Sequence, residues 1–407
     1  MGKVRPGALA VVATVCALVG SGLSLTVAKA TDWIGGGETD TVVLTEAAPA
    51  PAANRTDEES AAKPLPGNVF DPAAIYRERA AGVVTIDAFF GSGAASAAQG
   101  SGFVVSRDGY ILTNSHVITT AGEGAANETA EAADSVYVEF RDGDRVPARI
   151  VGWDIYDDVG LLKVDPEEHA LAPVPLGDSS QVVVGEPVAA IGSPFGYETT
   201  LAVGVVAATQ RSIESLTSPY DLVDAIQTDA PINRGNSGGP LFDARGRVVG
   251  INAQIRSESG TAEGVGFAVP INSAKRSMQQ LIETGEVRYA WLGVSTQTVT
   301  PKLAAHFGYA ESRGAAVQTV IDGSPADRAN LRAGGSGELY TGIRFRPGGD
   351  LIVAIGGMAV SSAEDVVRAV TERLRPGQST RLTIVRGDQR LVVEVVLGER
   401  PENPPSR

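Results

Sequence analysis

Ser237 lies in a glycine-rich segment, Asn-Arg-Gly-Asn-Ser-Gly-Gly-Pro, at residues 233–240. A serine hydroxyl becomes a useful nucleophile only when a base removes its proton and nearby donors stabilise the resulting oxyanion. Glycines let the backbone turn tightly, so that its N–H groups can converge on one point. The pattern predicts a nucleophile at Ser237, with an oxyanion hole formed by the amides of Gly235 and Ser237 on either side of Asn236. The alternative is a surface turn with an incidental serine.

Two further motifs could supply the base and its partner. His116 follows the strand-like run Tyr110–Thr113, and Asp158 directly precedes an apolar run, Val-Gly-Leu-Leu. An aspartate entering a buried strand is costly unless it is hydrogen-bonded, so Asp158 is expected to orient the imidazole. Asp157 is the competing carboxylate, although it and Asp154 are expected to be solvated. The order His, Asp, Ser also differs from the Ser, Asp, His order of esterases built on another triad fold.

The elements around these residues follow two patterns. From about 68 to 287, short apolar runs alternate with turn signals such as Asp108-Gly109 and Asp142-Gly143, which predicts an all-β sandwich or barrel. After about 288, strand-like runs alternate with two short helical stretches. The clearer helix begins after Ser362, which can form a capping box with Asp365. The sequence thus predicts a mainly β chain with a second, α+β domain.

Together these motifs resemble the HtrA (Deg) family of trypsin-like serine proteases with C-terminal PDZ domains. The resemblance covers about 70 to 398 and rests on four segments of this sequence: Thr113–Val117, Asp158–Lys163, Gln227–Ala230 and Asn233–Pro240. It implies a chymotrypsin-like double β-barrel protease domain at 68–287 and an α+β PDZ domain at 288–398. It also implies an ATP-independent endopeptidase that cleaves unfolded or tagged exported polypeptides, generally as a homotrimer. A silent protease fold that only binds its partners is the first rival interpretation.

The resemblance also places residues that motif chemistry alone does not. Ile232, Ala253 and Ile255 occupy positions that line the specificity pocket in similar proteins, and no acidic residue accompanies them. We therefore expect small or medium aliphatic residues before the cleaved bond. Arg211 resembles the family's sensor-loop arginine, which would relay occupancy of the PDZ domain; a solvated arginine without that role is the alternative. Asn236 carries no charge to pair with a new N-terminus, so activation by chain cleavage is not expected.

The predicted PDZ domain supplies a peptide-binding loop. Its residues are Trp291, Leu292, Gly293 and Val294, whose backbone N–H groups would capture a terminal carboxylate. The strand that follows would accept the peptide as an added strand, beside the helix that begins at Ser362. A structural α+β cap with an ordinary Leu-Gly turn is the alternative. The extra loop at about 334–349 has no physical explanation from the sequence.

Composition excludes several classes of function. The net charge of −14 argues against nucleic acid as a partner. Cys16 is the only cysteine, so neither an intramolecular disulfide nor a Cys/His zinc site can form. With only three histidines in the chain, a multi-histidine metal site is not expected either. The sequence predicts no metal and no cofactor.

The N-terminus predicts export. Lys3 and Arg5 precede an uncharged, largely apolar run over 8–28, long enough to cross a bilayer with the rest of the chain outside the cytoplasm. We expect a single-pass membrane anchor within 1–30, with cleavage as a signal peptide and secretion as the alternative. Residues 31–67 are rich in Ala, Pro, Glu and Thr and predict a disordered linker. Residues 399–407 predict a disordered tail, and the whole protein is placed in the cell envelope.

Overall fold

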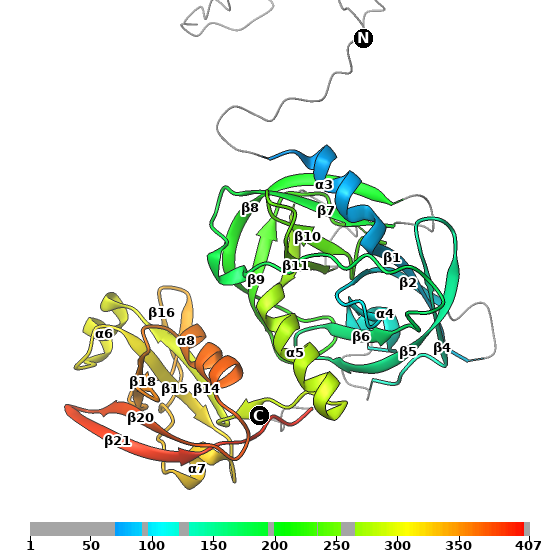
Figure 1. Cartoon of the computed structure of the whole chain (residues 1–407). Helices are drawn as coiled ribbons and strands as arrows, with labels where there is room; N and C mark the ends of the chain where they lie inside the picture. The colour runs from blue at the N-terminus through cyan, green and yellow to red at the C-terminus, as the bar shows by residue number, and fades with distance from the viewer. Residues whose placement is uncertain are drawn as a thin grey trace, which may run out of the picture. The chain divides into compact units, whose positions relative to one another are not determined.

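The computed structural model describes residues 70–91, 97–121, 130–193, 199–233, 235–253 and 265–402 (Figure 1). The predicted anchor at 1–30 and linker at 31–67 lie outside these residues. Within the described part of the chain, no helix is both long and apolar enough to cross a membrane.

Six antiparallel strands close into a first barrel, in the order β1-β2-β3-β6-β5-β4. They are β1 (Val83–Phe89), β2 (Ala97–Val104), β3 (Tyr110–Thr113), β4 (Ser135–Glu139), β5 (Arg145–Asp154) and β6 (Val159–Lys163). The predicted turn at Gly109 does join β2 to β3. Its φ is +95°, and a Cβ there would lie 2.1 Å from the carbonyl oxygen of Val164, so only glycine fits.

A second barrel closes in the order β10-β11-β12-β9-β8-β7. Its strands are β7 (Pro187–Gly192), β8 (Thr200–Ile213), β9 (Leu222–Thr228), β10 (Pro240–Phe242), β11 (Val248–Ala253) and β12 (Gly266–Pro270). The sequence left sandwich and barrel open, and the structure decides for two barrels, as the resemblance implied. Short helices flank them: α3 (Pro72–Arg79), η1 (Ala80–Gly82), α4 (Ser115–Ile118), η2 (Ser179–Gln181) and the longer α5 (Ile271–Thr284).

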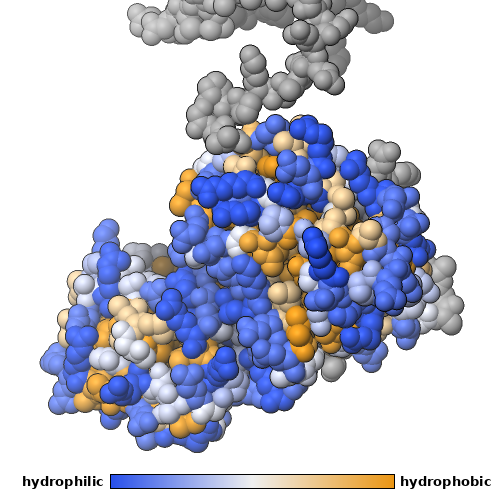
Figure 2. Space-filling model, in the orientation of Figure 1, coloured by the Kyte–Doolittle hydropathy of each residue, from blue (hydrophilic) through white to orange (hydrophobic). Residues whose placement is uncertain are grey.

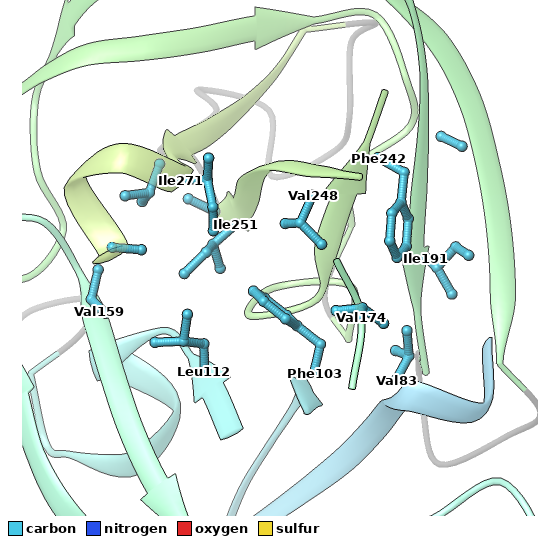
Figure 3. Close-up of a cluster of buried hydrophobic side chains, with 14 of the residues drawn as sticks. Val83, Phe103, Leu112, Val159, Val174, Ile191, Phe242, Val248, Ile251 and Ile271 are labelled. Carbon is cyan, nitrogen blue, oxygen red and sulfur yellow. The ribbon is translucent and has the colours of Figure 1, made fainter. Parts of the chain in front are cut away.

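The barrels share a core, because several strands are apolar on both faces. On β2, Phe103 packs in the shared cluster while Val104 packs inside the first barrel. On β7, Ile191 joins the shared cluster while Ala190 packs inside the second barrel. Successive side chains of a strand point to opposite faces, so burial on both sides requires uninterrupted apolar runs. Figure 3 shows the shared cluster between strands of the two barrels, with Ile271 of α5 among its members.

The C-terminal domain is built on the sheet β14-β15-β18-β20-β21, with β19 paired to β18. Its elements are β13 (Ala290–Trp291), β14 (Val294–Val299), α6 (Pro301–Phe307), β15 (Gly314–Val320), α7 (Pro325–Arg328), β16 (Glu338–Tyr340), β17 (Ile343–Phe345), β18 (Leu351–Ile355), β19 (Met358–Ala359), α8 (Ala363–Arg368), η4 (Ala369–Arg373), β20 (Ser379–Arg386), β21 (Gln389–Val396) and β22 (Gly398–Glu399). The predicted capping box is present: Ser362 and Asp365 exchange hydrogen bonds at the start of α8.

Two segments of this domain differ from the sequence prediction. The loop at 334–349 contains the hairpin β16–β17, which is seated by the fully buried ring of Phe345. The predicted disordered tail begins too early, because Glu399 of β22 pairs with Ala290 of β13 and the Arg400 guanidinium packs on tyrosine rings. Both segments are held by contacts with residues far away in the sequence, which local composition does not reveal.

The surface is mostly polar, as the charge of the chain predicts. Figure 2 shows hydrophilic residues over most of the visible face, with apolar residues in separate patches. The most exposed large apolar side chains are Val183, Val184, Leu339, Val392 and Val396. Val183 and Val184 lie between η2 and β7, Leu339 on β16, and Val392 and Val396 on β21, and we assign these residues no common role.

Candidate active site

His116 and Asp158 meet at one edge of the first barrel. β3 ends at Thr113 and the chain turns directly into α4, which carries His116; Asp158 immediately precedes β6, the neighbour of β3 in the sheet. The imidazole Nδ1 lies 2.8 Å from Asp158 Oδ2. Asp158, rather than Asp157, is therefore the carboxylate in contact with the His116 ring.

The Asp158 carboxylate is fixed by further donors. Its Oδ1 accepts from the Ser115 hydroxyl at 2.8 Å and from the His116 amide at 3.1 Å. The Asn114 side-chain amide donates to the Asp158 carbonyl at 2.8 Å. Asp158 itself has a φ of +49°, a conformation that non-glycine residues adopt only when their surroundings impose it. The carboxylate is therefore held in one orientation toward the imidazole.

The expectation that Asp154 and Asp157 are solvated is wrong. Asp154 is 1% exposed and Asp157 is 7% exposed. Both carboxyl groups contact the hydroxyl of Tyr289, at 2.6 and 2.8 Å respectively. Because this partner lies more than a hundred residues away in the sequence, the local run Asp-Ile-Tyr-Asp-Asp resembled an ordinary polar turn.

Ser237 belongs to the second barrel and immediately precedes the residues that lead into β10. It is 4% exposed, and its Oγ makes no hydrogen bond to the described residues. Its carbonyl oxygen accepts from the Ser101 amide of β2 at 2.8 Å, which ties the serine to the first barrel. The three predicted residues thus come from two barrels, His116 and Asp158 from the first and Ser237 from the second, and the Ser101 contact ties the backbone of Ser237 to β2 of the first barrel.

The loop around Ser237 depends on its glycines. Gly238 has a φ of +84°, and a Cβ there would lie 2.2 Å from the Ser101 carbonyl oxygen. Gly235 has a φ of +99°. Within the described residues, the loop's backbone hydrogen bonds use the amides of Asn236, Gly238 and Gly239 as donors, and not those of Gly235 or Ser237. This arrangement suits an oxyanion hole whose two donors are kept for a ligand.

Sequence reasoning missed Ser101. Its hydroxyl donates to the Gly235 carbonyl and accepts from the Ser193 amide at 2.8 Å, while it is itself fully buried. The signal was present as a serine between two glycines in an apolar strand, Gly100-Ser101-Gly102. A buried hydroxyl there needs partners, and the peptide before Asn236 supplies one.

The predicted specificity residues are only partly described. Ile232 and Ala253 are 8% and 5% exposed. Ile232 lies against β12, where a Cβ on Gly266 would meet its Cγ1 at 2.6 Å. Ile255 lies outside the described residues. Two of the three positions are therefore known to be apolar and buried beside the strands that follow Ser237.

The loop predicted to bind a carboxylate precedes an edge strand. The carbonyls of Leu292 and Gly293 accept from the amides of Ala326 and Ile321, each at 2.9 Å, which anchors the loop from behind. β14 pairs with β15 on one side and stands at the edge of its sheet. α8 contacts β14 through the Thr298 hydroxyl, which accepts from the Ala363 amide at 2.9 Å. An edge strand beside a helix can accept an extended peptide.

Comparisons with known proteins agree with this architecture. Residues 100–251 match the trypsin-like peptidase domain family, and residues 290–397 match the PDZ domain family. Among solved structures, an HtrA-type protease AlgW with tripeptide aligns at 34% identity with a TM-score of 0.67, covering 82% of this chain and 99% of that one. The chain belongs to the HtrA-type protease family.

Curated relatives are longer than this HtrA-type chain. A probable periplasmic serine endoprotease DegP-like of Hahella chejuensis is 41% identical over 74% of this chain and 57% of its own length. The protein of the same description from Brucella suis is 38% identical over 75% of this chain and 53% of its own length. The chain therefore spans little more than half the length of these relatives.

Arg211 lies on β8 of this HtrA-type chain, opposite Ala225 of β9. Its Nε donates to the Gln227 side chain at 3.1 Å. The residue beside Ala225 is Asp224, whose carboxylate is held by both arms of the Arg368 guanidinium of α8, at 2.7 and 2.9 Å. Arg211 thus lies beside a strand that an α8 residue of the PDZ domain contacts directly.

Three side chains among the described residues of the HtrA-type chain lie close enough together to be possible metal ligands: Asp142, Asp144 and His169. The histidine Nε2 pairs with Asp142 at 3.0 Å, and its ring stacks on Phe140 with centroids 3.7 Å apart. This hydrogen bond lowers the pKa of the Asp142 carboxyl. A hydrogen bond between the stacked histidine ring and an aspartate accounts for these contacts.

Proposed function

We propose that this chain is an ATP-independent serine endopeptidase of the cell envelope that cleaves unfolded or tagged polypeptides. The observation that carries the proposal is the 2.8 Å contact between His116 and Asp158, together with a glycine-rich Ser237 loop that the Ser101 amide ties to the same barrel. The trypsin-like and PDZ matches and the HtrA-type structural neighbours support it. The relatives, which are described as periplasmic endoproteases, support a location outside the cytoplasm.

In this mechanism Ser237 attacks the scissile carbonyl while His116 takes its proton and later donates it to the leaving amine. Asp158 keeps Nδ1 of the imidazole protonated and stabilises the imidazolium that forms. The amides of Gly235 and Ser237 hold the oxyanion, which develops only after attack, so their donation favours the transition state over the substrate. Water then attacks the acyl-enzyme while His116 takes a proton from it, and His116 returns a proton to Ser237 as the acyl group leaves.

Reversible ordering of the loop around Ser237 is the proposed control. Asn236 is 5% exposed and uncharged, and its side chain reaches the Thr200 hydroxyl and the Pro231 carbonyl, each at 3.4 Å. Such long, neutral contacts are weak compared with a buried ion pair. The loop therefore depends on its neighbours to set the geometry of Gly235, rather than on a new N-terminus made by cleavage.

The PDZ domain is proposed to bind the C-termini of peptides through the loop Trp291, Leu292, Gly293 and Val294 and the edge of β14. The contact between Arg368 and Asp224 supports a relay from α8 to β9, with Arg211 on the adjoining strand as the regulatory residue. Substrate capture or activation of the protease would follow from occupancy of the loop.

Replacing Arg211 by alanine is expected to remove most of the stimulation of proteolysis by peptide while leaving proteolysis without peptide in place. The measurement is the rate of casein cleavage with and without a peptide that ends in apolar residues. Arg149→Ala, at an exposed arginine of β5 in the first barrel, is the control and should be stimulated normally. Normal stimulation of the Arg211→Ala protein would contradict the relay.

Cleavage sites in casein test both the reaction and its specificity. The full chain should cut internal bonds without ATP, mainly after small or medium aliphatic residues, because Ile232 and Ala253 offer an apolar wall. Sequencing of the fragments by mass spectrometry gives the residue before each cut. Cuts mainly after Lys or Arg would contradict the specificity, and intact casein beside folded protein, with and without peptide, would contradict the reaction.

The remaining proposals concern assembly and boundaries. We propose a homotrimer, a single-pass anchor within 1–30 with secretion as the alternative, a linker at 31–67, a protease domain at 68–287 and a PDZ domain at 288–398. The two family matches, at 100–251 and 290–397, support the division near 288. Light scattering of the purified chain tests the trimer, and N-terminal sequencing of the mature protein tests the anchor.

A further inference from the structure

Three short oxygen–oxygen contacts connect two buried carboxyl groups in the turn that leads to Asp158. The Tyr289 hydroxyl lies 2.6 Å from Asp154 Oδ2 and 2.8 Å from Asp157 Oδ2. The Ser277 hydroxyl of α5 lies 2.6 Å from the same Asp154 oxygen. All four side chains are buried, so each polar atom needs a partner with matching donor and acceptor roles.

These contacts require one more proton than the hydroxyl groups hold. Ser277 and Tyr289 each supply a single hydroxyl proton, so together they can bridge two of the three contacts. The third contact would otherwise set two oxygen lone pairs against each other at hydrogen-bond distance in a buried site. One of the two carboxyl groups therefore carries a proton.

The donors around Asp154 identify it as the charged member of the pair. Its Oδ1 accepts from the amides of Tyr156 at 2.9 Å and Asp157 at 3.3 Å, and its Oδ2 faces both hydroxyls. Burial raises the pKa of the Asp154 carboxyl, but all four of these donors oppose that effect, so they favour the anion at Asp154 over an anion at Asp157. Tyr289 then gives its proton to Asp154, and the 2.8 Å contact between Tyr289 and Asp157 needs a proton from Asp157.

The nearby arginine does not supply that proton. Arg276 of α5 reaches only to 3.9 Å from Asp157 Oδ2, beyond hydrogen-bond distance. Its guanidinium donates instead to the Ser273 hydroxyl at 2.9 Å and lies 3.7 Å from Glu372. Within the described residues, the hydroxyl of Tyr289 is thus the hydrogen-bond partner of the Asp157 carboxyl.

We propose that Asp157 is a protonated positioning residue, which donates a hydrogen bond to Tyr289 and so holds the turn that presents Asp158 to His116. Asp158 follows it directly and has a φ of +49°, so the conformation of the turn sets the direction of the Asp158 side chain. The positioning role rests on the triad of the proposed function. Loss of the proton puts a second anion beside Asp154 and removes the hydrogen bond, which loosens the turn.

The surroundings of Asp157 make this ionisation accessible near neutral pH. Burial, and then the charge of Asp154, raise the pKa of the Asp157 carboxyl to about 6, against the smaller opposing effects of Arg276, Tyr289 and Arg400. A cavity of about 330 Å³ lies against the cluster, with Asp154 and Tyr289 in its lining.

The same cluster joins the protease domain to both ends of the PDZ domain. Tyr289 immediately precedes β13, and its carbonyl accepts from the Arg400 amide at 2.9 Å, just past β22. The Arg400 guanidinium lies 5.0 Å from the ring centroids of Tyr289 and Tyr220 and 5.3 Å from that of Tyr156, within cation–π range. Glu399 and Glu402 line the cavity nearby. The partner of Asp157 is therefore held by the segments that enter and leave the PDZ domain.

Two substitutions at Asp157 in the full chain test the positioning role, with kcat and KM for an internally quenched peptide measured from pH 5 to 8. Asp157→Asn keeps a neutral donor for Tyr289, so the ratio of wild-type kcat to variant kcat should be near one at pH 5. That ratio should fall several-fold by pH 8, because wild-type Asp157 loses its proton and the asparagine does not. Dividing the wild-type kcat by the variant kcat cancels the titration of His116, which both proteins share. Asp157→Ala removes the donor and should lower kcat at pH 5 by about tenfold, with little change in KM.

A ratio that stays constant over this pH range, or an alanine variant equal to the asparagine variant at every pH, would overturn the positioning role. Thermal unfolding tests the proton independently of catalysis. Folding raises the Asp157 pKa, so its contribution to stability is complete below about pH 4 and is lost as pH rises through about 6. The thermal midpoint of Asp157→Asn, relative to that of wild type, should therefore rise between pH 4 and pH 7. A difference in thermal midpoint that does not change with pH would contradict the protonation of Asp157. A difference that widens with pH, in a protein that shows no proteolysis, would support the protonation of Asp157 and contradict the triad.

Discussion

Ser237→Ala should lower kcat for peptide-bond cleavage by about 10⁶-fold, because the variant has no oxygen to form the acyl-enzyme. Ser237 is 4% exposed and its Oγ makes no hydrogen bond to the described residues, so removing that oxygen should cost little stability. The measurement is the initial rate on an internally quenched peptide, beside the thermal midpoint of each protein.

Ser180→Ala is the matched control for this change. Ser180 is an exposed serine in η2 whose hydroxyl bonds to Asp178 at 2.7 Å, away from the triad. Its rate should stay within about twofold of wild type, as is usual for surface substitutions. A Ser237→Ala protein that still cleaves at a comparable rate would show that another group is the nucleophile.

Asp158→Asn is expected to lower kcat by about 10⁴-fold while the fold is preserved. The amide nitrogen or oxygen would replace Oδ2 at 2.8 Å from His116 Nδ1, and an amide that donates there stabilises the wrong imidazole tautomer. It would also lose the charge that supports the imidazolium. The measurement is kcat against pH for wild type and variant under the same substrate conditions.

The adjacent change Asp157→Asn provides the comparison that separates the two carboxyl groups. Asp157 bonds to Tyr289 at 2.8 Å and asparagine keeps a donor there, so the change acts on Asp158 only through the turn. We expect kcat of Asp157→Asn to stay near that of wild type at pH 5 and to exceed it several-fold at pH 8, in contrast to the large loss expected for Asp158→Asn. Equal losses at the two positions would mean that the assignment of the triad carboxylate is wrong.

The fold class could be predicted, and three triad residues could be proposed, because their signals are local. Ser237 lies in a glycine-rich run, and His116 and Asp158 lie at the ends of apolar strands. Strand periodicity alone did not distinguish a barrel from a sandwich, because both need the same short runs with apolar residues on one or both faces. The resemblance to HtrA proteases made that choice, and the closure of both sheets agrees with it.

Contacts between distant parts of the sequence could not be predicted. Asp154 and Asp157 resembled solvated residues because Ser277 and Tyr289, the hydroxyls that accommodate them, lie more than a hundred residues further on. Arg400 fell in a proline-rich tail, yet it packs on three tyrosine rings. In each case a polar group is buried by partners that only the folded chain brings near, and composition in a local window favours the opposite conclusion.

Covalent labelling tests the central claim most directly. The full chain is treated with a fluorophosphonate, with and without a peptide ending in apolar residues, and the modified residue is located by mass spectrometry. An activated serine beside an oxyanion hole should give one adduct per chain, on Ser237, with faster labelling when peptide is present and none in Ser237→Ala. Folded protein that stays unlabelled under both conditions, or an adduct at another residue, would contradict the proposed active site.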